Sequence, residues 1–462
     1  MFRPLLLILC LAGPLAAEEA PLQRVPQSQA EVQLSFVPLV KRAAPAVVNI
    51  YARIMAEPRR TPLQSDPFFR RFFGDPEAEK PRVQNSLGSG VILSPDGIIV
   101  SNYHVVGMAT EIRVALSDRR EFTASVLLAD EDADLALLKI EDGDDLPYLP
   151  LRESDSVEVG ELVLAIGNPF GVGQTVSSGI VSGLARSGGA GGLGHGYYVQ
   201  TDAPINPGNS GGALVDTEGR LVGINTSILS RSGGSNGIGF AIPADLVAAF
   251  MEQARAGRHV FERPWAGMRG QPVDADLAAS IGLERPGGLI VSDRHPSSPF
   301  AQAGIEVGDV ITAVNGQPVN SASEMIYRMS VIGLGGTATI DLVRGGAELA
   351  LPVVLMAAPE DPPREEMQLG GSSLLPGLTL SRLNPAVTAD NGLAYDAEGV
   401  LILDPGSTGA RVGFRKGDLI LSINNSPVTR PAEVRDSLEA RQRGYEVVIQ
   451  RGARRIALRF RV

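Results

Sequence analysis

The chain has 462 residues, of which 44% are hydrophobic and 20% are charged, and this length suggests about three globular domains. Its formal net charge of −11 argues against a nucleic-acid-binding surface, and the lack of a Gly-x-x-x-x-Gly-Lys-Ser/Thr loop argues against ATP-driven unfolding. One cysteine and four histidines leave no cluster with zinc-ligand spacing, so we expect no metal and no other cofactor.

Residues 1–17 have the pattern of a cleaved secretory signal peptide. Arg3 precedes an apolar run over residues 5–11, and small residues end the segment at Ala17. This run is far shorter than the roughly 18 residues that a membrane-spanning helix needs, although an uncleaved interfacial helix is an alternative. Cys10 follows Leu9, which is not the small residue that a lipoprotein signal places there. The sequence therefore predicts export, without a lipid anchor, of a mature chain that has no thiol.

Residues 18–258 are dominated by short strand-like runs separated by Gly, Pro and Asp turns, which is typical of a pair of β-barrels. Residues 66–74 place four phenylalanines in a polar, proline-punctuated loop. These rings either pack under their own loop or meet the active site or another subunit. An amphipathic helix over residues 243–256, with Pro243 near its start and Gly257 after its end, should close this domain.

Three stretches of this region together indicate acyl-transfer chemistry. His104 follows a strand-like run, Asp134 begins another, and Ser210 lies in the glycine-rich sequence Gly208-Asn209-Ser210-Gly211-Gly212. Serine needs a base to become a nucleophile, and the order His, Asp, Ser is that of the chymotrypsin-type double barrel. Taken singly, His104 could be a structural histidine and Asp134 a surface carboxylate, but the ordered set favours a catalytic triad. The backbone N–H groups of Gly208, Asn209 and Ser210 are candidates for the oxyanion hole.

The C-terminal part of the chain contains an internal repeat. The segment 288–319 recurs at 399–428, and each copy continues into a helix-like segment with Glu324 or Glu433 at the same offset. The first of these helices is predicted to begin with a capping box formed by Ser321 and Glu324. Residues 358–373, with three prolines and several charges, are the predicted linker between the copies.

The motifs Ser101-Asn102-Tyr103-His104, Asp134-Leu135-Ala136-Leu137 and Gly208-Asn209-Ser210-Gly211-Gly212, followed by the repeat, closely resemble the HtrA/DegP family of periplasmic serine proteases. The resemblance implies a mainly β fold, with a chymotrypsin-like double barrel over residues 18–258 and PDZ domains over 259–357 and 374–462. It also implies a homotrimer or a larger multiple of trimers. In this family the phenylalanine-rich loop reaches toward the active site of another subunit.

The same resemblance suggests two binding sites. The family's primary specificity pocket falls on Ile205, Leu229 and Ile238, although all three could instead belong to the barrel core. Its peptide-carboxylate loop falls on Trp265, Ala266, Gly267 and Met268 in the first copy. The second copy has Pro376 in its corresponding loop, where proline removes a backbone donor, so that copy is expected to serve assembly instead.

The resulting hypothesis is an exported, ATP-independent serine endopeptidase that degrades misfolded or unfolded envelope proteins. Its first PDZ domain would capture peptide C-termini as an added strand, and the PDZ domains would regulate the protease. Two alternatives remain at this stage. The chain could act as a chaperone that holds unfolded clients, or as a PDZ adaptor in which the barrel no longer cleaves.

Overall fold

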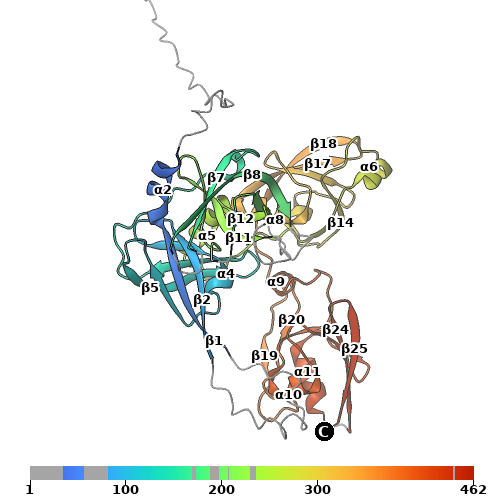
Figure 1. Cartoon of the computed structure of the whole chain (residues 1–462). Helices are drawn as coiled ribbons and strands as arrows, with labels where there is room; N and C mark the ends of the chain where they lie inside the picture. The colour runs from blue at the N-terminus through green and yellow to red at the C-terminus, as the bar shows by residue number, and fades with distance from the viewer. Residues whose placement is uncertain are drawn as a thin grey trace, which may run out of the picture.

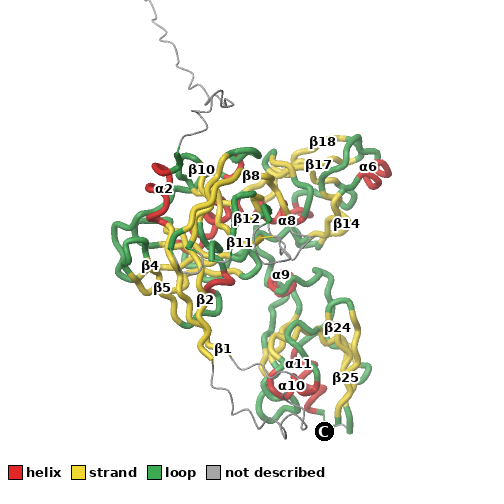
Figure 2. Tube along the Cα trace, in the orientation of Figure 1, coloured by secondary structure: helices red, strands yellow, loops and turns green. Residues whose placement is uncertain are grey.

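The structure, a computed structural model, describes residues 35–56, 82–168, 173–187, 197–206, 208–228, 236–440 and 443–461 (Figure 1). The predicted signal peptide, the phenylalanine-rich segment 66–74 and Leu229 lie outside these residues. Within the described part of the chain, no helix is long and apolar enough to cross a membrane. Strands dominate the architecture, and the helices are short (Figure 2).

The first six strands form a closed barrel in the order β1-β2-β3-β6-β5-β4. Short helices precede it and follow β3. In β4, Ile112 and Val114 are buried while their neighbours face solvent, as the alternation of a strand dictates. The elements are α2 (Val37–Ala43), η1 (Ala44–Ala46), β1 (Val47–Ala56), β2 (Arg82–Ile92), β3 (Ile98–Ser101), α4 (Tyr103–Val106), β4 (Glu111–Ala115), β5 (Glu121–Asp130) and β6 (Leu135–Ile140).

The next six strands form a second closed barrel in the order β10-β11-β12-β9-β8-β7. The helix predicted over residues 243–256 follows it as α5, with Pro243 at its N-cap. The elements are η3 (Ser154–Ser156), β7 (Leu162–Gly167), β8 (Thr175–Ser187), β9 (Tyr197–Thr201), β10 (Ala213–Asp216), β11 (Leu221–Ile228), β12 (Gly239–Pro243) and α5 (Ala244–Arg255). The two barrels confirm the predicted double-barrel fold.

The largest hydrophobic cluster joins the two barrels. Val91 and Leu137 of the first barrel pack in one cluster with Leu164 and Ile224 of the second, and Phe250 of α5 completes it. After α5, Phe261 stacks on Phe250 with ring centroids 4.0 Å apart, and Val260 forms an isolated bridge with Ala129 of β5 in the first barrel. Arg263 extends this contact by donating a hydrogen bond of 2.8 Å to Asp130, at the end of β5. Burial of this apolar surface holds the barrels together.

The first copy of the repeat forms a sheet in the order β13-β14-β15-β17-β18, with β16 paired to β15. Its helix α8 begins close to the predicted capping box: the Ser321 hydroxyl accepts a hydrogen bond of 3.1 Å from the Glu324 N–H, but the Glu324 carboxylate accepts one from the Asn320 N–H. The elements are β13 (Met268–Pro272), α6 (Ala275–Ile281), β14 (Leu289–Arg294), α7 (Pro299–Gln302), β15 (Val310–Val314), β16 (Gln317–Pro318), α8 (Ala322–Ile332), β17 (Thr337–Arg344) and β18 (Ala347–Val354).

The second copy repeats this topology with one additional strand, β19, in the order β19-β20-β21-β22-β24-β25, with β23 paired to β22. Strand β19 lies inside the segment 358–373 that was predicted as a linker, because it pairs with β20 and belongs to this sheet. The elements are β19 (Met367–Gln368), β20 (Thr379–Arg382), α9 (Pro385–Asp390), β21 (Val400–Asp404), α10 (Gly406–Val412), β22 (Leu419–Ile423), β23 (Ser426–Pro427), α11 (Pro431–Glu439), β24 (Tyr445–Arg451) and β25 (Arg454–Phe460).

Both copies contain the same internal ion pair, which ties the loop before one strand to the end of another. Asp309, only 1% exposed, accepts hydrogen bonds of 2.7 Å from two nitrogens of Arg344. Asp418 accepts bonds of 2.6 and 2.7 Å from Arg451 in the same way. The repeat in the sequence is therefore a repeat of structure and of its polar contacts.

Candidate active site

His104 and Asp134 come together at one end of the first barrel. His104 lies in α4, directly after β3, and Asp134 occupies the turn between β5 and β6 with φ of 52°. The Asn102 side chain donates a hydrogen bond of 2.9 Å to the Asp134 carbonyl oxygen. The His104 backbone N–H donates one of 3.0 Å to Asp134 Oδ1. These bonds fix the carboxylate relative to the imidazole ring.

The ring itself faces this carboxylate. His104 Nδ1 lies 2.9 Å from both Oδ1 and Oδ2 of Asp134. Because an ionised carboxylate only accepts hydrogen bonds, Nδ1 carries the proton and Nε2 is left as the acceptor in the neutral ring. The side chain of His104 is 52% exposed and that of Asp134 23%. The imidazole edge that bears Nε2 is therefore available to a donor.

Thr226, in β11 of the second barrel, contacts both halves of the site. Its hydroxyl donates a hydrogen bond of 2.6 Å to Asp134 Oδ2, and its carbonyl oxygen accepts one of 3.1 Å from the Ser210 hydroxyl. Sequence reasoning missed this residue, because a threonine within a strand-like run carries no motif of its own. Close by, burial and then the Asp134 charge raise the pKa of Tyr198, so this phenol stays neutral at neutral pH.

The loop that carries Ser210 is anchored to the first barrel through Ser89. The Ser89 N–H donates a hydrogen bond of 2.9 Å to the Ser210 carbonyl oxygen, and the Ser89 hydroxyl donates one of 2.7 Å to that of Gly208. The backbones also approach closely beside Ser210. A Cβ atom on Gly211 would lie 2.0 Å from the Ser89 carbonyl oxygen, so only glycine fits there.

The three candidate oxyanion donors differ in this structure. The Asn209 N–H donates a hydrogen bond of 2.9 Å to the Asn206 carbonyl oxygen, so it is occupied within the loop. Among the described residues, no acceptor is bound to the N–H groups of Gly208 and Ser210. Gly208 has φ of 98°, which favours glycine at this position. Two of the three candidate donors thus have no acceptor within the described part of the chain.

The residues suggested for a specificity pocket lie in different surroundings. Ile205 is 2% exposed and belongs to the core of the second barrel, where its Cδ1 atom fills the space beside Gly239. Ile238 is partly buried and packs against the cluster that joins the barrels. Leu229 is outside the described residues.

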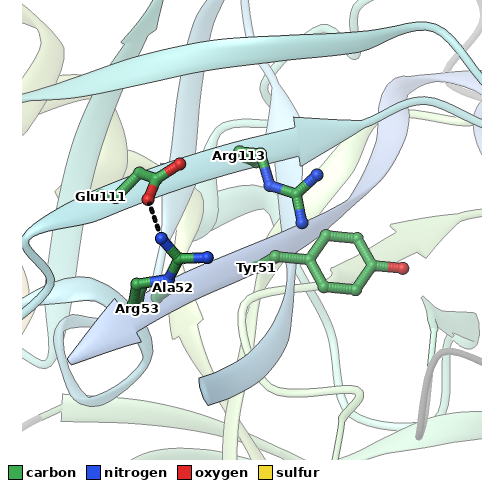
Figure 3. A pocket seen from close by; sticks show the side chains of 5 residues that line it. All are labelled: Tyr51, Ala52, Arg53, Glu111 and Arg113. Atoms are coloured by element: carbon green, nitrogen blue, oxygen red, sulfur yellow. Dashed lines mark hydrogen bonds and ion pairs between the residues drawn. The ribbon is translucent and has the colours of Figure 1, made fainter. Parts of the chain in front are cut away.

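A separate hollow of about 90 Å³ lies on the outer face of β1 and β4 (Figure 3). Its charged side chains neutralise each other: Arg53 pairs with Glu111 at 2.7 Å, while Arg113 pairs with Glu121 at 3.1 Å and lies over the Tyr51 ring. None of His104, Asp134 and Ser210 lines it. Within the described ranges, no group of three His, Cys, Asp or Glu side chains could hold a metal ion.

The loop Trp265–Met268 begins the first repeat copy and leads into β13, which forms one edge of the sheet. The carbonyl oxygens of Ala266 and Gly267 are occupied, since they accept hydrogen bonds from the Ser298 hydroxyl and the His295 N–H. The Gly267 N–H donates to no described acceptor, and Gly267 has φ of 59°. The loop therefore has a backbone donor available for a ligand.

The corresponding loop of the second copy differs. The Gly377 N–H donates a hydrogen bond of 2.9 Å to the Leu369 carbonyl oxygen, and the Leu378 N–H donates one of 3.2 Å to that of Leu375. Pro376 has no N–H to offer. The donors of this loop are consumed within the copy itself.

Comparison with known protein families gives three matches along the chain. A trypsin-like peptidase domain matches residues 88–224, and PDZ domains match residues 267–355 and 400–451. A probable periplasmic serine endoprotease, DegP-like, from Pseudomonas fluorescens is 37% identical over 89% of this chain and 90% of its own length. The periplasmic pH-dependent serine endoprotease DegQ from Escherichia coli is 36% identical over 92% of this chain and 91% of its own.

Solved structures give the same result. The HtrA-type protease AlgW with a decapeptide is 41% identical, with a TM-score of 0.53, and the match covers 71% of this chain and 99% of that chain. The same protease with a tripeptide is 38% identical, with a TM-score of 0.54 and coverage of 71% and 98%.

Proposed function

The chain belongs to the DegP/DegQ family of HtrA-type serine endoproteases and is a serine endopeptidase, and from this premise we propose that His104, Asp134 and Ser210 are its catalytic triad. The observation that carries the proposal is the contact of His104 Nδ1 with Asp134 at 2.9 Å, while Thr226 hydrogen-bonds both Asp134 and Ser210. Thr226 thus hydrogen-bonds two of the three residues, and the third, His104, contacts Asp134.

In the proposed mechanism, His104 Nε2 takes the proton of Ser210 as the hydroxyl attacks the scissile carbonyl. For this step the Ser210 side chain must leave the Thr226 carbonyl oxygen, to which it donates in this structure, and turn toward His104. Asp134 holds the ring in the required tautomer and stabilises the imidazolium that forms. The imidazolium then gives its proton to the leaving amine, and water completes the second half of the reaction.

We assign the oxyanion hole to the N–H groups of Gly208 and Ser210, which are free of described acceptors. The Asn209 N–H could join them only if its bond to Asn206 broke. Donors of this kind stabilise the tetrahedral intermediate because they point at the charge that develops on the oxygen. The fixed backbone at Ser89 supports this assignment, since it holds the loop on both sides of Asn209.

We further propose that Ile205, Leu229 and Ile238 line the primary specificity pocket. The aliphatic character of all three favours small apolar substrate side chains such as valine or alanine and disfavours charged ones. The position of Ile205, at the start of the loop that carries Ser210, supports its place beside such a pocket.

Peptide capture is proposed for the first PDZ domain. An extended peptide would add to the free edge of β13, beside α8, with its C-terminal carboxylate at the backbone of Ala266, Gly267 and Met268. The second PDZ domain, whose loop donors are used internally, would serve assembly. We assign domain boundaries at residues 18–258 for the protease and 259–357 for the first PDZ domain, and we extend the second PDZ domain from the expected 374–462 to 367–462 because β19 belongs to its sheet.

The relatives are named as periplasmic proteases, and we propose the same location for this chain, after removal of a signal peptide at residues 1–17. Its substrates would be misfolded or unfolded envelope proteins, and its assembly a homotrimer or a multiple of trimers. An unfolded polypeptide suits the site because strand addition requires an extended chain.

Labelling with a fluorophosphonate probe tests the triad directly. We expect the probe to modify Ser210 alone, with the adduct located by peptide mass, and we expect His104→Ala to abolish labelling because the hydroxyl then lacks its base. Labelling at another serine, or unchanged labelling of His104→Ala, would remove these residues from the proposed roles.

A further inference from the structure

The second PDZ domain contacts the first through a short segment between α9 and β21. The Arg269 guanidinium, in β13, donates a hydrogen bond of 2.7 Å to Asp396 Oδ1 and lies 5.6 Å from the centre of the Tyr395 ring. The Tyr395 hydroxyl hydrogen-bonds Asp293 in β14. One cation and one carboxylate of the first domain are therefore matched by a carboxylate and a hydroxyl of the second.

The Tyr395 ring also begins a row of aromatic contacts that leads to the peptide-carboxylate loop. Its centroid lies 6.0 Å from that of His295, at an interplanar angle of 89°, and His295 lies 5.4 Å from Trp265 at 64°. Both are edge-to-face arrangements, a geometry that aromatic pairs prefer. The row thus runs from the second domain, through one histidine, to the first residue of the loop Trp265–Met268.

The two inner members of this row hold the loop in place. The His295 N–H donates a hydrogen bond of 2.7 Å to the Gly267 carbonyl oxygen. The Trp265 ring covers Gly267 so closely that a Cβ atom there would lie 2.6 Å from it. Trp265 is 9% exposed and His295 is partly buried, so movement of the histidine would disturb the packing of the loop.

We propose that the second PDZ domain docks on the first within the same chain through Tyr395 and Asp396, and that this contact positions the loop Trp265–Met268 for peptide binding. The inference rests on the proposed role of that loop as the carboxylate site. Tyr395 is a positioning residue in this scheme, since it acts through His295 and Trp265. Holding a loop in its binding conformation increases affinity because less order has to be imposed on binding.

The charges make the contact specific without making it strong. The side chains of Arg269 and Asp396 are 49% and 54% exposed, and solvent screens such pairs. Burial and then the hydrogen bond to Asp293 raise the pKa of Tyr395 to about 12, so its hydroxyl remains a donor throughout the neutral range. We therefore expect loss of this contact to weaken peptide binding several-fold and not to abolish it.

Trp265 makes the test direct, because it is the one tryptophan in the chain and its fluorescence reports on the loop. The full chain with Ser210→Ala, which should not cleave the probe, would be titrated with a tryptophan-free decapeptide that ends in valine. The free acid is the ligand and the C-terminal amide is the control. We expect Tyr395→Ala to shift the Trp265 emission to longer wavelength and to raise the Kd of the free acid about 5-fold, whereas Tyr395→Phe keeps the ring contact and most of the affinity.

Two controls distinguish loss of the contact between the PDZ domains from nonspecific destabilisation of the fold. Tyr148→Ala removes a tyrosine of the segment between β6 and η3 that is 52% exposed, and it should leave both readouts unchanged. Arg269→Asp and Asp396→Arg should each weaken binding, and the combined exchange should restore it because the ion pair is rebuilt with reversed sign.

The inference is overturned if Tyr395→Ala binds the free acid with the affinity of the parent, or if the combined charge exchange fails to restore binding. If the parent does not bind the free acid at all, the assignment of the carboxylate site itself falls, and the inference falls with it. If the parent binds the free acid and Tyr395→Ala binds it equally well, the carboxylate site stands and only the inference about the second PDZ domain is overturned.

Discussion

Thr226 donates a hydrogen bond of 2.6 Å from its hydroxyl to Asp134, although the two residues belong to different barrels. The same residue accepts the Ser210 hydroxyl on its carbonyl oxygen. Thr226 is 7% exposed, so solvent cannot easily replace its hydroxyl. The orientation of the Asp134 carboxylate toward His104 thus depends on Thr226. Among the described hydrogen bonds, none joins Thr226 to the imidazole itself.

Replacing Thr226 by valine should lower kcat about 10- to 100-fold with little change in KM, because a hydrogen bond to a charged group is lost while the shape is kept. Thr226→Ser retains the hydroxyl and should restore most of the rate. Peptide cleavage kinetics measure both values. Equal kcat values for the valine variant and the parent would show that catalysis does not depend on the hydrogen bond from Thr226 to Asp134.

Replacing Ser210 by alanine should reduce proteolysis of unfolded casein by about a million-fold in kcat, the loss typical of a missing nucleophile. The fold should persist, since the Ser210 side chain makes one described hydrogen bond, to Thr226. Circular dichroism and the unfolding midpoint serve as controls. Cleavage at the parental rate by a pure sample of this variant would contradict the triad. The same variant tests the chaperone alternative, through its ability to suppress aggregation of an unfolded client.

Gly208→Ala should lower kcat about 100-fold, because a residue with Cβ resists φ of 98° and the shifted N–H no longer points at the oxyanion. Gly257→Ala is the matched control, since Gly257 has φ of 78° with open space around it and lies at the end of α5. Both variants carry similar backbone strain. Loss of activity in both alike would assign the effect to stability and not to the oxyanion loop.

Asp309→Asn should destabilise the first PDZ domain by roughly 5 °C in its unfolding midpoint, followed by Trp265 fluorescence. Burial alone would raise the pKa of Asp309, but hydrogen bonds from Arg344 and from the Glu306 N–H outweigh it and lower the pKa below 3.8. The folded state therefore favours the ionised form.

The sign of the pH dependence follows from this shift. The stabilising contribution of Asp309 is fully present above the unfolded pKa and is lost as the pH falls through the lower, folded value. The difference between parent and Asp309→Asn should be constant from about pH 7 to 5 and should shrink below about pH 4. Asp276→Asn, at an exposed position of α6, is the control. A difference that grows as the pH falls below 4 would contradict the assignment.

Much of the fold was predictable because it follows from local patterns. Alternating apolar residues between Gly, Pro and Asp turns indicated two barrels, and the recurrence of 288–319 at 399–428 indicated two domains of one kind. The end of the predicted linker 358–373, which the structure places before β19, could not be predicted from such patterns. Strand β19 has two residues, and its pairing with β20 depends on tertiary contacts that no periodicity reveals.

The candidate site was predictable to the extent that its residues carry motifs. His104, Asp134 and Ser210 lie in recognisable stretches, and the structure brings the first two into contact. Thr226 has no such signal, since its role arises from the docking of β11 against the first barrel. The occupied N–H of Asn209 depends likewise on the path of the loop, which a sequence of glycine and asparagine leaves open.

The division of the site between the barrels has a consequence for the whole molecule. In the proposed triad, the first barrel provides the base His104 and its carboxylate Asp134, while the second provides the nucleophile Ser210 and its neighbour Thr226. A molecule whose halves have separated, through heat or because folding is incomplete, keeps every reactive group and yet cannot cut. An incompletely folded molecule would therefore not cleave other proteins before its two barrels have docked. On heating, cleavage activity should be lost at a lower temperature than the β-strand signal, because the barrels separate before their strands unfold.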